Sequence, residues 1–514
     1  MAEKRQPGGA VLMDASAARA GEAAGSGPGV AAGSGPGVAT GPGWPLASLD
    51  LTRAWLVDPA TGREGPGEIV VRDGLLEAVT WLQGAEAEGV TPDGVIVAPG
   101  FIDLHAHLRE PGNEDAETVA TGLSAAAHGG FTTVCAMPNT TPAADDASVL
   151  MAELGAAARS GSPVRLLPYG AVSVGRAGEQ LAPLGELADA GAVGFSDDGS
   201  PVRSGAVLRN ALLYAGMLDR PIVDHAEDLG QTQGAEANEG LVATVLGLRG
   251  WPAAAEEAAV ARDLAILAEV IRAEPRARLH LTHLSVPGSL ELVRRAKAAG
   301  LPVTCDVTPH HLALTDEWLA GGRRFAWESS GTAGDAGSSY ALGGRREAPP
   351  YATSLRVNPP LRRPSDAKTC LEALADGTVD AVATDHAPHS QVEKDVEFGA
   401  AANGISGIET AIGLLLAAVA AGQLTLVRAI EALTSGPARV LGGSLGHTPG
   451  LVEGAPADLV VIDASDAWQV TMDGLRSRGK NSPLLGRDLP GRVLLTLAGG
   501  RVAYVDAEAH DEHP

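Results

Sequence analysis

The chain has 514 residues, which is enough for one large catalytic domain and a smaller one. Its hydrophobic fraction of 45% supports a substantial core, whereas its formal net charge of −25 argues against a general binder of nucleic acid or anionic membranes. Three cysteines without a CxxC pair, no signal-peptide pattern and no apolar run near about 18 residues predict a soluble cytoplasmic protein.

Beyond a Gly/Ala-rich N-terminal stretch, the regions near the two ends of the chain share one alternating pattern of apolar and polar residues. Residues 1–45 are almost entirely Gly, Ala, Pro and Ser and predict a disordered tail. Residues 46–98, with GEIVVRDGLLEAV, alternate apolar and polar residues around Gly/Asp turns, a pattern typical of antiparallel strands. The same pattern returns at 447–506 in ADLVVID and VLLTLAGGRVAYV, before a short tail at 507–514. We therefore expect a small β-sandwich domain built from both chain ends.

Residues 99–446 instead alternate short apolar runs with Ala/Leu-rich stretches that can form helices. Buried parallel strands read as continuous apolar runs, so eight runs predict an α/β fold, a (β/α)₈ TIM barrel with its chemistry at the carboxyl ends of the strands. The polar, Gly-rich segment 321–352 is expected to be a loop between the last two strands. The runs are FIDLHAH, TTVCAMP, VRLLPYGAV, AVGFSDDG, PIVDHAE, RLHLTHLS, PVTCDVTPHH and DAVATDHAP.

Histidine and aspartate residues finish six of these runs. In a barrel the strand ends converge on one funnel, so these side chains are expected to meet. Four histidines with carboxylates form a ligand set suited to Zn²⁺ or a similar divalent ion. In run order, the residues are His105 and His107, then Asp197 and Asp198, His225, His283, His310 and His311, and Asp385 with His386.

The strongest single motif is the HxH pair. If APGFIDLHAH is a strand, His105 and His107 share one face, and Arg109 continues the same row. An isolated HxH is weak evidence, but the later strand-end residues strengthen it. Asp385 could both ligate a metal and move a proton, with a structural cap as its alternative.

Other residues leave more than one interpretation. His280 is expected to be a core or supporting residue, and His128 to face the carboxyl end of a helix. For His310 and His311, supporting roles and direct contact are both open. The SDDG segment containing Asp198 could be an ordinary turn, although its position after the fourth run favours a metal ligand.

Several motifs resemble the dihydroorotase family, of the bacterial class I type, in the amidohydrolase superfamily. The resemblance lies in PGFIDLHAHLREPG, AMPNTTP and ATDHAPHSQVEK, with TPHHL at 309–313, NPPLR at 358–362 and GISGIET at 404–410. It extends from about 50 to 505. HxH alone is shared across the superfamily, whereas this combination is specific within it.

The resemblance implies a centre of one or two Zn²⁺ ions per subunit. Many relatives carry a carbamylated lysine after the fourth strand, but none of the five lysines of this chain lies there. The matching residue is Asp198. The implied metal ligands are His105, His107, Asp198, His225, His283 and Asp385.

The implied reaction is the reversible cyclisation of N-carbamoyl-L-aspartate to L-dihydroorotate in de novo pyrimidine (UMP) biosynthesis. By resemblance, Asp385 moves the proton between water and the ring nitrogen, and Arg109 clamps the substrate carboxylate. Position 403 is often aromatic in relatives, so its contact can differ here. The implied substrate-binding residues are His107, Arg109, Asn139, Asn358, His389, Asn403 and Gly404.

Two alternative functions stay open. Another cyclic amidohydrolase, an allantoinase or a hydantoinase/dihydropyrimidinase, shares the fold and HxH but usually carries the strand-four lysine and needs no Arg–Asn pair for a ring carboxylate. A non-catalytic scaffold for aspartate carbamoyltransferase would lose metal ligands, and all expected ligands are present. An active subunit that also binds the transcarbamoylase fits the same motifs. We expect a homo-oligomer with no nucleic-acid or membrane partner.

Overall fold

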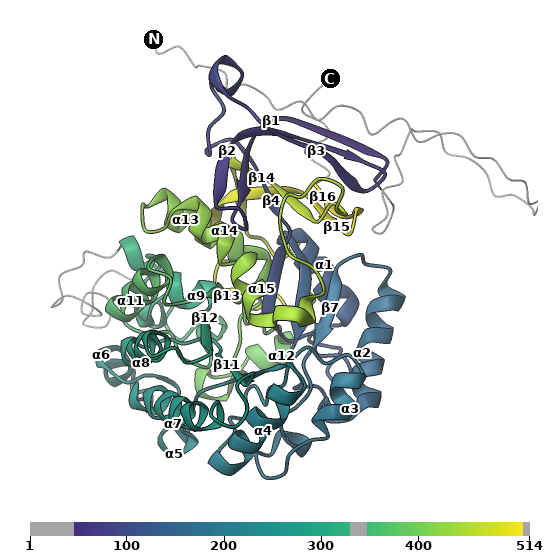
Figure 1. Ribbon diagram of the computed structural model, residues 1–514. Helices are drawn as coiled ribbons and strands as arrows, with labels where there is room; N and C mark the ends of the chain where they lie inside the picture. Colours follow the sequence, from purple (N-terminus) through teal and green to yellow (C-terminus); the bar gives the residue numbers. More distant parts are fainter. Residues whose placement is uncertain (1–45, 329–346, 507–514) are drawn as a thin grey trace, which may run out of the picture.

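The computed structural model describes residues 46–328 and 347–506. The expected tails at 1–45 and 507–514, and part of the loop at 321–352, lie outside the described residues. Figure 1 shows a β-sheet region built from both chain ends next to a larger region of strands and helices. Among the described helices, none has the length and apolarity needed to cross a membrane.

The strands from the two chain ends form one seven-stranded sheet in the order β16-β15-β14-β4-β1-β2-β3. The turn between β2 and β3 contains Asp73 and Gly74 with φ of 48° and 76°, the left-handed geometry of tight hairpins. One buried cluster joins Leu56 and Ile69 to Leu459 and Leu497, so both chain ends share a core. The strands are β1 (Ser48–Asp58), β2 (Arg63–Arg72), β3 (Leu75–Trp81), β4 (Val95–Pro99), β14 (Leu459–Gln469), β15 (Asp488–Ala498) and β16 (Arg501–Val505).

Between the chain ends lie two parallel sheets, β5-β6-β7 and β8-β11-β12-β13. Phe195, in the fourth predicted strand, forms only isolated parallel bridges, to Gly170 after β7 and to Ile222 in β8. A parallel bridge from Ala106 to His386 links the other edges. The strands are β5 (Phe101–Ala106), β6 (Phe131–Ala136), β7 (Arg165–Pro168), β8 (Pro221–Asp224), β11 (Arg278–Leu281), β12 (Val303–Val307) and β13 (Ala381–Val382). A separate pair is β9 (Ala237–Asn238) with β10 (Gly250–Trp251).

The helices alternate with these strands and have recognisable ends. The Asp146 side chain caps α2 by accepting from the Ser148 amide, and Gly161 ends it with a φ of 71°. The longer helices are α1 (Val119–His128), α2 (Ala147–Ser160), α4 (Gly205–Met217), α7 (Ala254–Val270), α8 (Pro287–Ala298), α11 (Pro364–Ala375) and α13 (Ala411–Ala420). The shorter ones are α3 (Leu184–Asp189), α5 (Leu229–Thr232), α6 (Leu241–Leu246), α9 (Pro309–Ala313), α12 (Gln391–Lys394), α14 (Leu426–Glu431) and α15 (Ser435–Leu441).

The sequence suggested that the segment APGFIDLHAH is one strand, but the structure divides it between two strands. Gly100 separates β4, in the seven-stranded sheet, from β5, in the parallel sheet. A Cβ at Gly100 would lie 2.3 Å from the Thr132 side chain, so only glycine fits where the chain changes sheets. The imidazoles of His105 and His107 face the same way, with Nε2 atoms 3.3 Å apart, but Arg109 does not continue a strand row, because β5 ends at Ala106 and Arg109 has a φ of 61°.

Candidate active site

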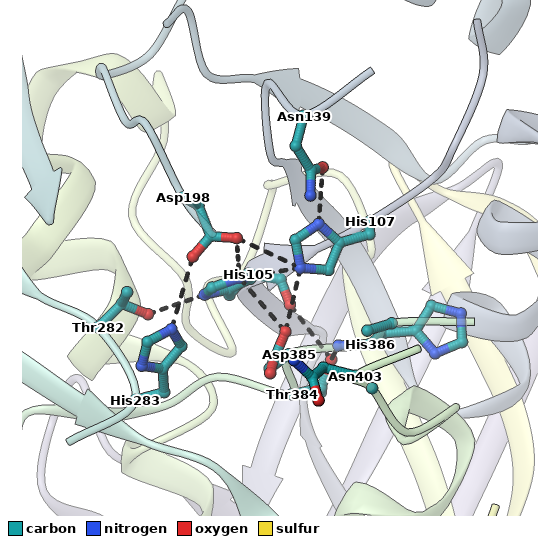
Figure 2. A network of polar contacts seen from close by, with 12 residues as sticks. His105, His107, Asn139, Asp198, Thr282, His283, Thr384, Asp385, His386 and Asn403 are labelled. Atoms are coloured by element: carbon teal, nitrogen blue, oxygen red, sulfur yellow. Dashed lines mark hydrogen bonds and ion pairs between the residues drawn. The ribbon is translucent and has the colours of Figure 1, made fainter. Parts of the chain in front are cut away.

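His105 lies in β5, one residue before its carboxyl end, and the other five candidate metal ligands follow a parallel strand or lie in the fourth run; all six are buried. Figure 2 shows how several of them point toward one another. His283 and Asp385 have φ of 41° and 45°, a conformation that non-glycine residues adopt only where the surroundings impose it. Sharp turns at these two strand ends thus aim the side chains into the cluster.

The first group of facing ligand atoms comes from three strand ends. His105 Nε2 and His107 Nε2 lie 3.3 Å apart. Asp198 Oδ2 lies 3.4 and 3.5 Å from these nitrogens. Asp385 Oδ1 lies 3.4 Å from His105 Nε2 and 3.1 Å from His107 Nε2. Two nitrogens bound to one tetrahedral zinc ion are about 3.3 Å apart, so this spacing fits a metal site.

The second group shares Asp198. Its other oxygen, Oδ1, lies 3.4 Å from His225 Nδ1 and 3.5 Å from His283 Nε2, and these nitrogens are 2.9 Å apart. Asp198 therefore contributes one oxygen to each group that could hold a metal ion. Its neighbour Asp197 instead accepts the Ser173 amide and hydroxyl, so the two aspartates of SDDG have separate roles.

Buried hydrogen bonds fix the orientation of the His105 ring on the side that faces away from the cluster. His105 Nδ1 lies 2.8 Å from Thr282 Oγ1, which lies 3.1 Å from Asp306 Oδ2. Because the ionised Asp306 only accepts, Thr282 donates to it and accepts from His105 Nδ1. The Nε2 lone pair of His105 then faces the cluster. His280, expected to be a supporting residue, lies 2.8 Å from the same Asp306 oxygen.

Two further imidazoles are oriented in the same way. His107 Nδ1 lies 2.8 Å from Asn139 Oδ1, so the predicted substrate residue Asn139 also holds a ligand. His225 Nε2 lies 3.0 Å from Glu227 Oε2, which also accepts from Asn358 Nδ2. The sequence analysis missed Glu227 and Thr282. The acidic residue two positions after His225 was the available signal for Glu227.

The electrostatics of the cluster call for a cation. Burial raises the pKa of Asp198, but His105 and the other imidazoles lower it further, so its pKa lies well below the usual range. Burial lowers the pKa of His105, but Asp198 and Asp385 raise it to about 9. Asp198 Oδ1 has no hydrogen-bond partner among the described residues. Buried ionised carboxylates need positive charge beside them, which protonated imidazoles or a metal ion can supply, and the donor set of these residues fits a metal.

The predicted carboxylate-binding residues lie together beside this cluster. Arg109 Nε donates to the Pro388 carbonyl at 3.1 Å, and its Nη2 lies 3.2 Å from His389 Nε2. His389 Nε2 donates to the Asn403 carbonyl at 2.8 Å, while its Nδ1 has no hydrogen-bond partner in the described ranges. Burial lowers the pKa of Arg109 while Asp385 and Glu393 raise it, so the guanidinium lies within electrostatic reach of Asp385.

The sequence analysis also missed Asn481, a buried residue of the C-terminal segment. Its Oδ1 accepts from the His389 amide and the Ser406 hydroxyl, both at 2.8 Å. Its Nδ2 donates to the Ala387 and Gly404 carbonyls at 3.0 and 2.9 Å. One amide thus holds together the two loops that carry His389 and Gly404. No local motif marks this role.

The adjacent histidines of TPHHL differ. His311 Nδ1 lies 2.8 Å from Thr308 Oγ1, and its Nε2 donates to the Pro359 carbonyl at 3.1 Å, next to Asn358. His311 therefore has a supporting role. His310 is buried, its Nε2 has no hydrogen-bond partner among the described residues, and burial lowers its pKa to about 4.

Solved structures with the same fold identify the class of protein. The L-hydantoinase (dihydropyrimidinase) of Arthrobacter aurescens superimposes with a TM-score of 0.71 at 25% identity, covering 88% of this chain and 95% of that one. The dihydropyrimidinase of Brevibacillus agri shares the fold, with a TM-score of 0.67 at 19% identity over 89% and 95% of the two chains. The fold and the His/Asp cluster thus define a metal-dependent cyclic amidohydrolase.

Sequence relatives give the family. A family model described as "Dihydro-orotase-like" matches residues 94–275. The dihydroorotase of Anaeromyxobacter dehalogenans is 47% identical over 88% of this chain and 97% of its own length. That of Pelotomaculum thermopropionicum is 44% identical, with the same coverage. The chain belongs to the dihydroorotase family.

Proposed function

We propose that this chain catalyses the reversible cyclisation of N-carbamoyl-L-aspartate to L-dihydroorotate, a step of pyrimidine biosynthesis. The observation that carries the substrate assignment is the position of Arg109 and His389 beside the His/Asp cluster. A ring carboxylate distinguishes dihydroorotate from dihydrouracil and allantoin, and a guanidinium is the side chain best suited to bind it.

The proposed centre would hold one or two zinc ions, and Asp198 belongs to both groups of candidate ligands. His105, His107 and Asp385 would complete one site, and His225 with His283 the other. The support for two ions is the division of the Asp198 oxygens between the two groups. When bound, such ions polarise the ring carbonyl and lower the pKa of a water molecule.

The remaining roles fall to the chain's own side chains. Asp385 takes the proton from the attacking water and passes it to the ring nitrogen, and the reverse during cyclisation. Arg109, Asn139 and His389 bind the substrate carboxylate, with His107 bordering the same space. Asn358 and the Asn403–Gly404 backbone contact the ring. Asn358 Oδ1, which has no hydrogen-bond partner within the described ranges, supports the assignment of Asn358.

We also propose the domain boundaries and assembly. Residues 99–446 form a closed (β/α)₈ barrel, supported by the bridges through Phe195 and between Ala106 and His386. Residues 46–98 and 447–506 form one small β domain, the predicted β-sandwich, whose unity is supported by a common seven-stranded sheet and a shared core. The enzyme is a cytoplasmic homo-oligomer that can bind aspartate carbamoyltransferase, and its buried free cysteines accord with a reducing compartment.

The test is hydrolysis of L-dihydroorotate by the purified chain, followed by ultraviolet absorbance, with dihydrouracil and allantoin in parallel. Each assay is run before and after chelation and again after zinc is restored. We expect turnover of dihydroorotate alone, lost on chelation and recovered with zinc. Preferred turnover of dihydrouracil or allantoin would contradict the substrate assignment. A folded, zinc-loaded chain without any turnover would favour the scaffold alternative.

A further inference from the structure

A cavity of about 260 Å³ lies away from the metal cluster, where α1 and α13 pack against β14, β15 and β16. Figure 1 shows α1 close to the strands of the seven-stranded sheet. None of the predicted metal or substrate residues lines this cavity. Ligand sites occur preferentially where two structural units meet, so the cavity is a candidate binding site. The side chains used below are His128, Glu409, Trp468, Arg476, Arg492 and Tyr504.

One wall of the cavity is aromatic. The ring of His128 lies 5.7 Å from that of Trp468, at 63°, and 4.9 Å from that of Tyr504, at 57°. Trp468 and Tyr504 are only half-buried, so their surfaces are accessible from the cavity. Aromatics form 3% of the chain, which makes their grouping here notable. Such a wall favours a planar ring as ligand.

The charges of the cavity leave one cation uncompensated. Glu409 contacts His128 Nδ1 and accepts the Arg476 amide at 2.7 Å. Arg492 Nη1 faces Asp506 at 3.6 Å. The guanidinium of Arg476 is exposed, and across the residues that the structure describes it forms no ion pair or hydrogen bond. An unpaired arginine at an aromatic cavity favours an anion, which the local guanidinium has to bind against the net charge of −25 of the chain.

Three buried hydrogen bonds and one longer polar contact, between Glu117 and His386, connect this cavity to the active site. The Ser477 amide donates to Glu409 at 3.0 Å, and its hydroxyl donates to Glu117 at 2.5 Å. Glu117 Oε2 lies 3.5 Å from His386 Nε2. The His386 carbonyl accepts the amide of His107, a predicted metal ligand, at 2.8 Å. A ligand that shifts Arg476 would move the backbone amide that Glu409 accepts, and would act through Glu409 on this set of polar contacts.

We propose that this cavity binds a planar anion of the nucleoside monophosphate class, and that its occupancy reaches the metal cluster through Glu409, Ser477 and Glu117. The ring lies against Trp468 and Tyr504, and the phosphate is held by Arg476. Binding here is independent of the substrate assignment, so it can be measured directly on the zinc-loaded chain.

The binding test is calorimetric titration of the full, zinc-loaded chain with UMP, with uridine and inorganic phosphate as partial probes. We expect one UMP per chain with a dissociation constant of about 1 mM or tighter, and weaker binding of either partial probe. Arg476→Gln should weaken UMP by roughly tenfold, whereas Arg478→Gln, two residues along and outside the cavity, should not. Arg476 is exposed, so its replacement should leave the fold intact.

Three results would overturn the site: no UMP binding, equal binding in Arg476→Gln, or phosphate alone binding as tightly as UMP. Loss of UMP binding in Arg109→Met, with retention in Arg476→Gln, would place UMP in the active site and also overturn it.

The coupling is tested by assaying dihydroorotate turnover with and without saturating UMP. We expect UMP to change KM or kcat by about twofold or more. Ser477→Ala keeps the backbone amide that donates to Glu409 but loses the hydroxyl that donates to Glu117. This variant should bind UMP normally and show no kinetic response. Unchanged kinetics in the UMP-bound wild type, or an undiminished response in Ser477→Ala, would disprove the coupling.

Discussion

The metal side of the site, which comprises the six candidate metal ligands, and the substrate side, which comprises Arg109 and His389 with their loops, are built differently. On the metal side, ligands sit at strand ends, and partners on nearby strands or in adjoining segments, such as Thr282 and Glu227, hold their outward-facing nitrogens. On the substrate side, Arg109 and His389 lie in loops held mainly by backbone carbonyls and by the remote Asn481. Strand ends are fixed by the sheet itself, whereas these loops depend on contacts that arise only in the assembled fold.

This difference predicts separate kinetic consequences. Changes on the metal side should lower metal content or kcat, because they alter the groups that act on the reacting bond. Changes on the substrate side should mainly raise KM, because they alter the groups that hold the carboxylate. Variants that mix the two effects would break the distinction.

The largest effect is expected for Asp198→Asn, since Asp198 contributes an oxygen to both ligand groups. Its loss of charge should remove at least one ion and lower kcat by about 10³-fold or more. Metal analysis and kinetics on the same preparation would measure both. Asp197→Asn is the matched control and should keep its metal, because Asp197 faces Ser173 instead. Full metal content and near-normal turnover in Asp198→Asn would rule out the shared-ligand role.

Asp385→Asn should lower kcat by roughly 10²- to 10⁴-fold, because the amide cannot accept the proton from water. The side chain keeps its shape, so the melting temperature of the zinc-loaded protein should change little. KM for dihydroorotate should stay within a few-fold of the wild-type value. A large rise in KM with kcat preserved would assign Asp385 to the substrate side.

The clustering of the metal-side residues could be predicted from the sequence, because strand-end residues follow directly from the pattern of apolar runs; their role as metal ligands stays a prediction. His225 and His283 follow β8 and β11 as expected, and the cluster brings both to Asp198. Choosing Asp198 over Asp197 required the family resemblance, since both lie in one turn. The resemblance also supplied Arg109, but its predicted place in the strand row was wrong because the chain turns with a left-handed φ at that residue.

The contacts that hold the substrate-side loops in place could not be predicted from the sequence. Asn481 is separated by 92 residues from His389 and by 77 from Gly404, and its own segment carries no motif. Such contacts depend on how the C-terminal segment packs on the loops. The fourth strand was overpredicted for a related reason, because an apolar run reveals burial but not how many ladder bonds form.

Arg109→Met should raise KM for dihydroorotate by about 100-fold, with kcat falling much less. Loss of a charge-assisted contact to a carboxylate costs roughly 2–3 kcal/mol, which corresponds to that change in binding. Arg109→Lys keeps the charge without the paired donors and should fall between wild type and Arg109→Met. Metal content should be unchanged in both variants. An unchanged KM in Arg109→Met would contradict the carboxylate-binding role.

The smallest effect on turnover is expected for Asn481→Ala, which touches neither metal nor substrate. Removing this amide leaves the Ala387 and Gly404 carbonyls and the His389 amide without their partner, so stability should fall by about 2–3 kcal/mol. The freed loops should raise KM by roughly fivefold to tenfold, since binding then has to order them. Metal content and kcat should stay near wild type. Because instability alone would lower the amount of active enzyme and not KM, a shift in KM identifies a positioning role. Normal KM in the folded variant would mean that the loops hold their own shape, and the contrast between the two sides would disappear.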